Sequence, residues 1–259
     1  MAVGMGIRIF VHAMRMVFGN LRAALRIGGV ALVVLLALGI SAGLTPPPGA
    51  LHGPSTAGMA TNLLLTIARV IVGLWVAVAW HRFILLEETP GALLPRWNGA
   101  AIWAYVKAGV VLALIVLLII LPIAFVGGLL MVPMTASMAT SASPRLLMAL
   151  IGLIITFLPA CYIFYRLSPV LPAAAVGSRL SLREAWFQTS PGAGALAMLT
   201  LVSIVASWLV QYPGLLIAGV TPAMALIWIT VVQWLVLMVG VSIVTTIYGH
   251  YVEKRDLNA

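Results

Sequence analysis

Charged side chains are scarce in this sequence of 259 residues. Only 7% of the residues are Asp, Glu, Lys or Arg, and 63% are hydrophobic, whereas an ordinary soluble domain is about 25% charged. A surface that faces water cannot be made from this composition, so the chain must use lipid as its solvent. In lipid every backbone polar group has to be paired internally, which leaves helices or a closed β-barrel. Long unbroken apolar runs favour helices, because barrel strands alternate polar and apolar residues.

Acidic residues and cysteine are especially rare. None of the five acidic residues lies within the interior of an apolar run: Glu87 and Glu88 come at the end of one run, and Glu184, Glu253 and Asp256 lie outside the runs. Coupled transport therefore loses most of its support, because it usually needs a carboxylate or a histidine inside a span. The single cysteine, Cys161, excludes an intramolecular disulfide and a metal site built from several cysteines.

Familiar catalytic motifs give no support for an enzyme. The sequence has no Gly-x-x-x-x-Gly-Lys phosphate loop, His-Glu-x-x-His zinc motif or Gly-x-Gly-x-x-Gly run, and we expect no nucleophile elbow. We therefore expect no enzymatic activity, no cofactor and no metal site. An enzyme would require His81, Glu87 and Glu88 to converge on a pocket, although their spacing is not a recognised ligand set.

Six apolar runs are long enough to cross a membrane, since about 20 residues suffice. The expected spans cover residues 27–44, 61–88, 108–130, 146–165, 193–210 and 223–248. The predicted fold is an all-α, polytopic membrane protein. It has six transmembrane helices arranged as three helical hairpins, with amphipathic interfacial helices on the cytoplasmic side. The predicted domains are a basic N-terminal segment (1–26), a six-helix domain (27–250) and a short cytoplasmic tail (251–259).

Several local features refine this prediction. Uncharged loops are expected at 45–60 and 131–145, and a break is expected at 212–214, where Tyr-Pro-Gly occurs. Ser181 followed by Glu184 predicts a capping box that opens a short helix. Gly28 and Gly29 are expected to allow a close helix neighbour.

The N-terminal segment carries a basic stripe. At 100° per residue, six residues fall within about 40° of one line: Arg8, His12, Arg15, Gly19, Arg22 and Arg26. The opposite side is apolar and includes Ile9 and Val17. This pattern predicts a helix in the membrane surface, with its basic side toward anionic phospholipids. The helix could be a topogenic anchor or a sensor of lipid or of a partner.

The remaining basic residues indicate the orientation. Of the 14 basic residues, all but Arg69 and Arg145 lie on one side of the six predicted spans. The positive-inside rule makes that side cytoplasmic and places both termini there. The net charge of +9 is therefore explained by topology, and no nucleic-acid partner is expected.

Arg69 is a basic residue inside a predicted span, which makes it a candidate site. Its guanidinium could bind a phosphate or carboxylate, extend to the outer headgroups, or donate to a neighbouring helix. The candidate ligand-binding residues are Arg69, His81, Arg82, Glu88 and Arg166. Polar residues of the fifth span and Gln233 in the sixth could join helices or line a path for substrate.

The ends of the even-numbered spans are similar at a period near 84 residues: Trp80-His81-Arg82, Phe164-Tyr165-Arg166 and His250-Tyr251. This pattern suggests three related hairpins in parallel orientation. Equally, any exit from a membrane gathers aromatic and basic residues, and both interpretations remain open.

Four short motifs carry a resemblance to known proteins: RLSPVLPA at 166–173, LREAW at 182–186, WHR at 80–82 and YGHY at 248–251. With them the chain resembles uncharacterised six-helix inner-membrane proteins of alphaproteobacteria. More distantly, it resembles the membrane domain of some bacterial glycerophosphoryl diester phosphodiesterases. The resemblance implies a bacterial inner membrane and a lipid-facing role. Because the sequence contains no counterpart of the catalytic domain, it does not imply phosphodiesterase activity.

The sequence thus favours a non-enzymatic accessory protein of the membrane that binds anionic phospholipid or another membrane protein. The alternative is a transporter or lipid-translocating protein that uses Arg69 and the polar face of the fifth span.

Overall fold

The computed structural model describes residues 2–44, 56–91, 94–137 and 142–257. Every regular element in that part of the chain is a helix. Six of these helices are long and apolar enough to cross a membrane. The prediction of an all-α, multi-pass membrane protein with six spans is therefore confirmed.

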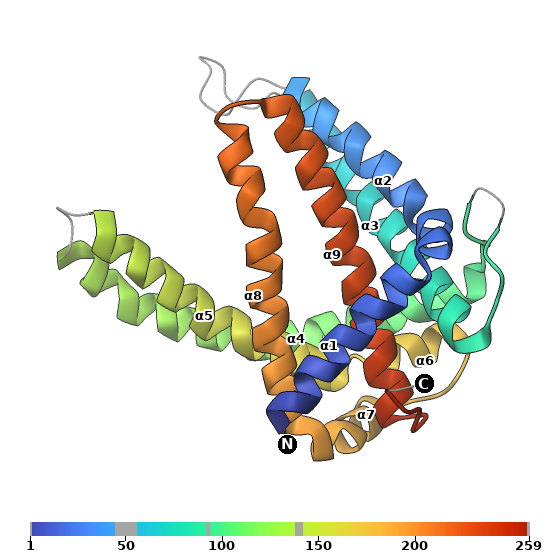
Figure 1. Ribbon diagram of the computed structural model, residues 1–259. Helices are drawn as coiled ribbons and strands as arrows, with labels where there is room; N and C mark the ends of the chain where they lie inside the picture. The colour runs from blue at the N-terminus through green and yellow to red at the C-terminus, as the bar shows by residue number, and fades with distance from the viewer. Residues whose placement is uncertain (1, 45–55, 92–93, 138–141, 258–259) are drawn as a thin grey trace.

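The helices follow one another along the chain. Their bounds are α1 Ala2–Gly19, α2 Leu21–Leu44, α3 Thr56–Leu86, α4 Gly99–Ser137, α5 Ala142–Leu167, α6 Val170–Val176, α7 Leu182–Thr189, α8 Ala193–Ala218 and α9 Pro222–Tyr251, with a 3-10 turn at Ser190–Gly192. Figure 1 shows the axes of α2, α3, α8 and α9 roughly aligned, with α2 and α3, and likewise α8 and α9, running in opposite chain directions. The helices α4 and α5 extend together to one side. Both termini, α6 and α7 lie at one end, which we call the basal end. The opposite end, where α8 turns into α9, is the distal end.

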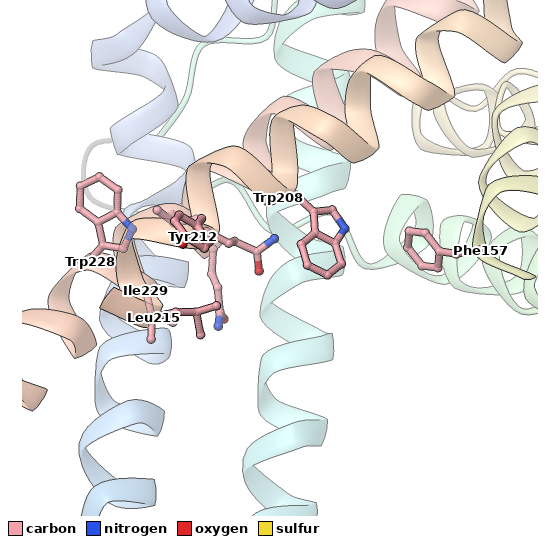
Figure 2. A pocket seen from close by; sticks show the side chains of 9 residues that line it. Phe157, Trp208, Tyr212, Leu215, Trp228 and Ile229 are labelled. Carbon is pink, nitrogen blue, oxygen red and sulfur yellow. The ribbon is translucent and has the colours of Figure 1, made fainter. Parts of the chain in front are cut away.

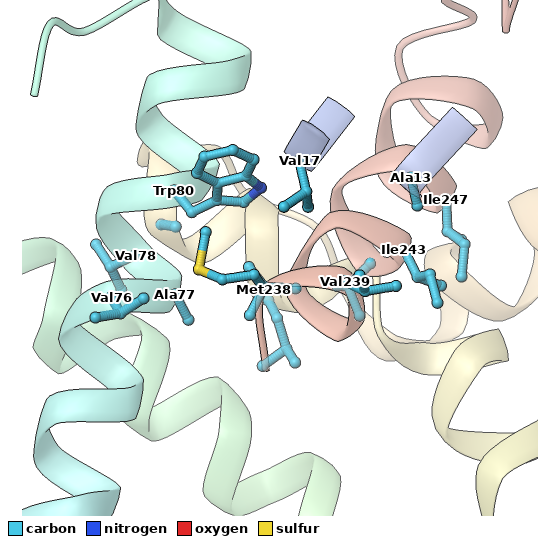
Figure 3. Packing of buried hydrophobic residues seen from close by; sticks show 14 of the residues in the cluster. Ala13, Val17, Val76, Ala77, Val78, Trp80, Met238, Val239, Ile243 and Ile247 are labelled. Carbon is cyan, nitrogen blue, oxygen red and sulfur yellow. The ribbon is translucent and has the colours of Figure 1, made fainter. Parts of the chain in front are cut away.

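The core is built around α9. Half of an apolar 18-residue stretch of α9 is buried, compared with 6% of the corresponding stretch of α4. Figure 3 shows Met238 of α9 close to Trp80 of α3 and Val17 of α1, and Ile247 of α9 close to Ala13 of α1. All five are 0% exposed. The basal half of the molecule is therefore tightly packed, whereas α4 has little protein around it.

Indole groups fasten neighbouring helices to α9. Trp80 Nε1 donates to Ser242 Oγ (2.8 Å), and Trp234 Nε1 donates to the Gly28 carbonyl (3.0 Å). A Cβ at Gly28 would meet Trp234, whereas Gly29 has open space around it. The prediction of a close helix neighbour is thus confirmed for Gly28 and wrong for Gly29.

Several expected loops are helical instead. The expected loop at 131–145 is mostly occupied by the ends of α4 and α5, and part of the one at 45–60 by the start of α3; residues 45–55 and 138–141 lie outside the described residues. The predicted break at 212–214 is also wrong, because α8 continues through Pro213. By contrast, the capping box of Ser181 and Glu184 is present at the start of α7.

The N-terminal segment forms two helices, because α1 ends at Gly19 and α2 begins at Leu21. The basic stripe is divided between them, with Arg8 and Arg15 on α1 and Arg22 and Arg26 on α2. All four arginines are exposed. Ile9 and Val17 were expected on a membrane-facing side, but they are fully buried on the side of α1 that packs against α8 and α9. The apolar face of α1 that the sequence predicted to contact lipid therefore contacts other helices instead.

Gly6 is the point at which α1 approaches the backbone of α8. A Cβ at Gly6 would run into the Ala195 carbonyl and would lie 2.9 Å from the Leu199 amide nitrogen, whereas a Cβ at Gly4 would meet nothing within 4 Å. We expect Gly6→Ala to lower the free energy of unfolding by about 1–3 kcal/mol, because the backbones must move apart. The measurement is equilibrium unfolding in mixed micelles.

Gly4→Ala is the matched control on the same helix. It adds the same methyl group and is expected to be neutral or stabilising by up to about 1 kcal/mol through helix propensity. Equal effects of the two substitutions would contradict the close approach of α1 to α8.

Candidate functional site

The five candidate ligand-binding residues do not form one site. Arg69 lies on α3 toward the distal end, Arg82 and Glu88 form an ion pair at its basal end, and Arg166 lies at the basal end of α5. His81 is fully buried. These residues therefore belong to separate locations with different contacts.

Arg69 lines a cavity of about 270 Å³ between α2, α3 and α9. Its side chain is exposed, and its guanidinium donates a hydrogen bond to Gln233 Oε1 on α9. At about 1.5 Å per residue, Arg69 lies about 26 Å from the end of α3 at Leu86, and Gln233 lies about 27 Å from the end of α9 at Tyr251. The two polar groups therefore meet at one depth, in the distal half of the spans.

The lining of this cavity changes from polar to apolar with depth. Thr66, Arg69 and Gln233 form its distal rim, and residues nearer the basal end of the same helices, including Val72 and Leu237, are apolar. Side chains lean toward the N-terminus of their helix, which is the distal end for both α3 and α9. The guanidinium and the amide therefore lean toward the distal membrane surface.

Arg69 has no carboxylate of this chain at its depth. The acidic residues follow α3, lie in α7 or follow α9, all of them at the basal end. In the part of the chain that the structure describes, its guanidinium donates across to the neutral amide of Gln233 on α9. A charge inside a bilayer is costly unless it is paired, so this cavity favours an anion.

A larger cavity of about 410 Å³ adjoins Gln233 on the other side. Figure 2 shows Trp208, Tyr212 and Leu215 along α8, with Trp228 and Ile229 on α9 and Phe157 across from Trp208. Gln233 lines both cavities. Aromatic walls with few polar groups suit an apolar occupant such as an acyl chain.

His81 connects α3 to α9 and α4. Thr245 Oγ1 donates to the Val241 carbonyl (2.8 Å), so it accepts from His81 Nδ1 (2.8 Å). The Nε2 atom then carries the lone pair and faces the Tyr105 hydroxyl at 3.4 Å. His81 is 0% exposed, and its ring contacts Thr245 and Tyr105, whereas Glu88 binds Arg82. The structure therefore gives this histidine a structural role between helices.

Arg82 and Glu88 do come together. Arg82 Nε donates to Glu88 Oε2 (2.9 Å), and a second bond joins the guanidinium to Oε1. Glu87 adopts a positive φ of 55°, which turns the chain after α3 and brings Glu88 back over Arg82. The Arg82 guanidinium holds the pKa of the Glu88 carboxyl below its ordinary value. Arg82 also donates to the Ala175 carbonyl (2.9 Å), so the pair ties α3 to α6.

Arg166 is held by neutral groups. It is 4% exposed and donates to Thr189 Oγ1 (2.9 Å), the Tyr162 hydroxyl (3.0 Å), the Trp186 carbonyl (2.8 Å) and Ser190 Oγ (2.9 Å). Its guanidinium also lies over the Trp186 ring, 3.9 Å from the centroid. These partners come mainly from α7 and the turn that follows, so Arg166 positions α7 against the end of α5.

Sequence reasoning missed two parts of these sites. It noted Gln233 without pairing it to Arg69, and it did not assign Arg96 to any pocket. The pairing of Gln233 with Arg69 could have been predicted, because strongly polar side chains in apolar spans tend to pair.

A Gly-x-Ser-x-Gly string does occur at 39–43, but it lies inside α2. A nucleophile elbow requires a strand-to-helix turn, so this string is not one.

No known protein family model, curated protein or solved structure matches this chain. The resemblance to six-helix inner-membrane proteins therefore stays a prediction. Among the residues that the structure describes, no group of three His, Cys, Asp or Glu side chains could hold a metal ion.

Proposed function

We propose that this chain is a non-enzymatic accessory protein of a bacterial inner membrane that binds an anionic phospholipid at Arg69. The observation that carries this proposal is the guanidinium of Arg69 at the rim of a cavity between α2, α3 and α9, at a depth where the chain has no carboxylate. An anion supplied by the membrane would neutralise it.

The depth profile of the cavity supports a lipid of the distal leaflet. Such a lipid has its phosphate toward the distal surface and its acyl chains toward the bilayer centre. The cavity has Arg69 and Gln233 at its distal rim and apolar residues below them. A phosphate oxygen can accept from the guanidinium, while an acyl chain follows the apolar part.

The proposed topology places the basal end in the cytoplasm. The basic residues other than Arg69 and Arg145 belong to the segments at the basal end, in agreement with the positive-inside rule. In addition, α1 exposes the apolar residues Val3, Ile7 and Phe18 beside the exposed Arg8 and Arg15. This combination suits an amphipathic helix in the membrane surface. We further propose that α2–α3, α4–α5 and α8–α9 are three related hairpins.

The test is native mass spectrometry of the protein purified in mild detergent with added phosphatidylglycerol. We expect Arg69→Ala to weaken lipid retention about tenfold, because a charge-assisted hydrogen bond contributes about 1.5–3 kcal/mol. Lys107→Ala is the control, since Lys107 is an exposed cation on α4 outside the cavity. Equal retention by all three proteins would overturn the proposal and direct attention to a partner membrane protein.

Lipid translocation is a second candidate function, favoured by the position of Gln233 between two cavities. A flux assay in reconstituted vesicles separates the two functions. Movement of labelled lipid between leaflets that depends on Arg69 would support translocation, and binding without movement would support the accessory role.

A further inference from the structure

A second pocket of about 230 Å³ lies at the basal end, and we call it the basal pocket. It is formed by the start of α2, the end of α3 and the segment that leads into α4. Its polar lining is made mainly by Arg82, Glu88, Arg96 and Asn98. Its position is separate from the Arg69 cavity, with which it shares no lining residue.

The segment that carries Arg96 is well fastened. Trp75 Nε1 donates to the Arg96 carbonyl (3.2 Å), and the rings of Trp75 and Trp97 meet edge to face, with centroids 5.4 Å apart. Asn98 Oδ1 accepts from the Ala101 amide (3.1 Å) and so caps α4. The pocket is thus held in shape by contacts that need no ligand, as expected of a pre-formed site.

The charge of the basal pocket is positive. Arg82 and Glu88 form an ion pair, and Arg96 also attracts the Glu88 carboxylate. With two guanidinium groups and one carboxylate, the lining residues keep one net positive charge. The Arg96 guanidinium donates to the Thr89 hydroxyl at 3.3 Å and is exposed. The positive end of the α4 dipole adds to this field. Arginine matches the geometry of phosphate oxygens particularly well.

The surroundings of the pocket indicate the source of the phosphate. Trp97 is 64% exposed and Leu94 is 54% exposed, and large apolar side chains at a membrane boundary suit the level of the headgroups. Ile27 and Ala79, which belong to membrane-spanning helices, complete the wall. The pocket therefore combines a cation with a surface that an acyl glycerol can contact.

We propose that the basal pocket binds the phosphate group of a phospholipid headgroup from the leaflet at the basal end. Arg96 makes the charged contact, and Trp97 packs against the glycerol region. The bound lipid would hold the connection between α3 and α4 at the membrane surface. This site does not depend on the lipid proposed at Arg69, because the residues and the leaflet differ.

The experiment compares the original protein with Arg96→Gln, Arg69→Ala and the double variant by native mass spectrometry with phosphatidylglycerol. We expect Arg96→Gln to weaken retention at one site about tenfold, with or without Arg69→Ala. Lys107→Gln, an exposed cation of α4 outside the pocket, is expected to change nothing. Thermal unfolding checks that the variants remain folded. Because each substitution is tested alone and in the double variant, the effect of Arg96→Gln on lipid retention can be measured even if Arg69→Ala has no effect.

A parallel titration with inorganic phosphate identifies the source of the anion. Lipid retention that depends on Arg96 and persists in millimolar phosphate supports a headgroup site. Phosphate binding that depends on Arg96, without such lipid retention, would overturn the assignment to a lipid. Equal lipid retention by Arg96→Gln and the original protein would overturn it as well.

Discussion

Arg166→Ala is expected to lower the free energy of unfolding by about 3–5 kcal/mol. The guanidinium makes four hydrogen bonds in a nearly closed environment. Each bond to a charged group contributes about 1.5–3 kcal/mol, but the four act as a unit, so their sum overstates the loss. Because three of the acceptors lie on α7 or in the turn after it, the substitution should release α7 first.

Equilibrium unfolding in mixed micelles measures this effect. Arg166→Lys is expected to recover part of the loss, because an ammonium keeps the charge without the planar fork. Arg183→Ala is the matched control on α7, where the guanidinium is exposed and lies 5.6 Å from the Phe187 ring centroid. It should cost less than about 1 kcal/mol. Similar losses for Arg166→Ala and Arg183→Ala would contradict the role given to Arg166.

Trp80→Ala is expected to destabilise the protein by about 3 kcal/mol. Trp80 is 0% exposed and packs between α3 and α9, with its indole bonded to Ser242. Truncation of a buried aromatic side chain usually costs about 3–5 kcal/mol. We place this effect at the lower end because an unfolded membrane protein remains in lipid, which reduces the hydrophobic part and leaves the packing part.

Two further variants test the cause of this effect. Trp80→Phe keeps most of the ring and removes the N–H group, so it is expected to cost about 1 kcal/mol. Trp103→Ala removes an indole that is 62% exposed on α4 and should have little effect. If Trp103→Ala lowered the free energy of unfolding as much as Trp80→Ala, the effect would have to come from contacts of the indole with the micelle and not from packing in the core.

Hydropathy was sufficient to predict the six spans, because the bilayer imposes their length and apolar character on the sequence. The helix ends were harder to predict. At Pro213 the sequence indicated a break, since proline removes a backbone donor. In the structure α8 continues, and Trp228 Nε1 donates to the Val210 carbonyl (3.2 Å) one turn before the proline. The carbonyl that Pro213 itself leaves without a donor is that of Leu209, four residues before it, so the indole bonds to the next carbonyl along. It fastens α9 to α8 beside the proline, and such tertiary contacts are not contained in local sequence.

The candidate site residues, too, were visible in the sequence, but their partners were not. The isolation of Arg69 in an apolar run was visible in the sequence, but its partner Gln233 lies on a helix far along the chain. An enzymatic site would have required His81 and Glu88 to converge on a pocket. The positive φ of Glu87 instead turns Glu88 toward Arg82, while His81 is directed to Thr245. Which partner each of these side chains contacts depends on tertiary packing, which the local sequence does not specify.

The length of α4 has a consequence for the shape of the protein in a bilayer. Its 39 residues make a helix about 58 Å long, whereas the hydrocarbon core is about 30 Å thick. A helix of this length must tilt or extend beyond the core, and bilayer thickness influences which of these occurs. Since so few residues of α4 are buried by protein, the surrounding lipid supplies most of its contacts. The angle between the α4–α5 pair and the other spans is therefore a joint property of the chain and of its membrane.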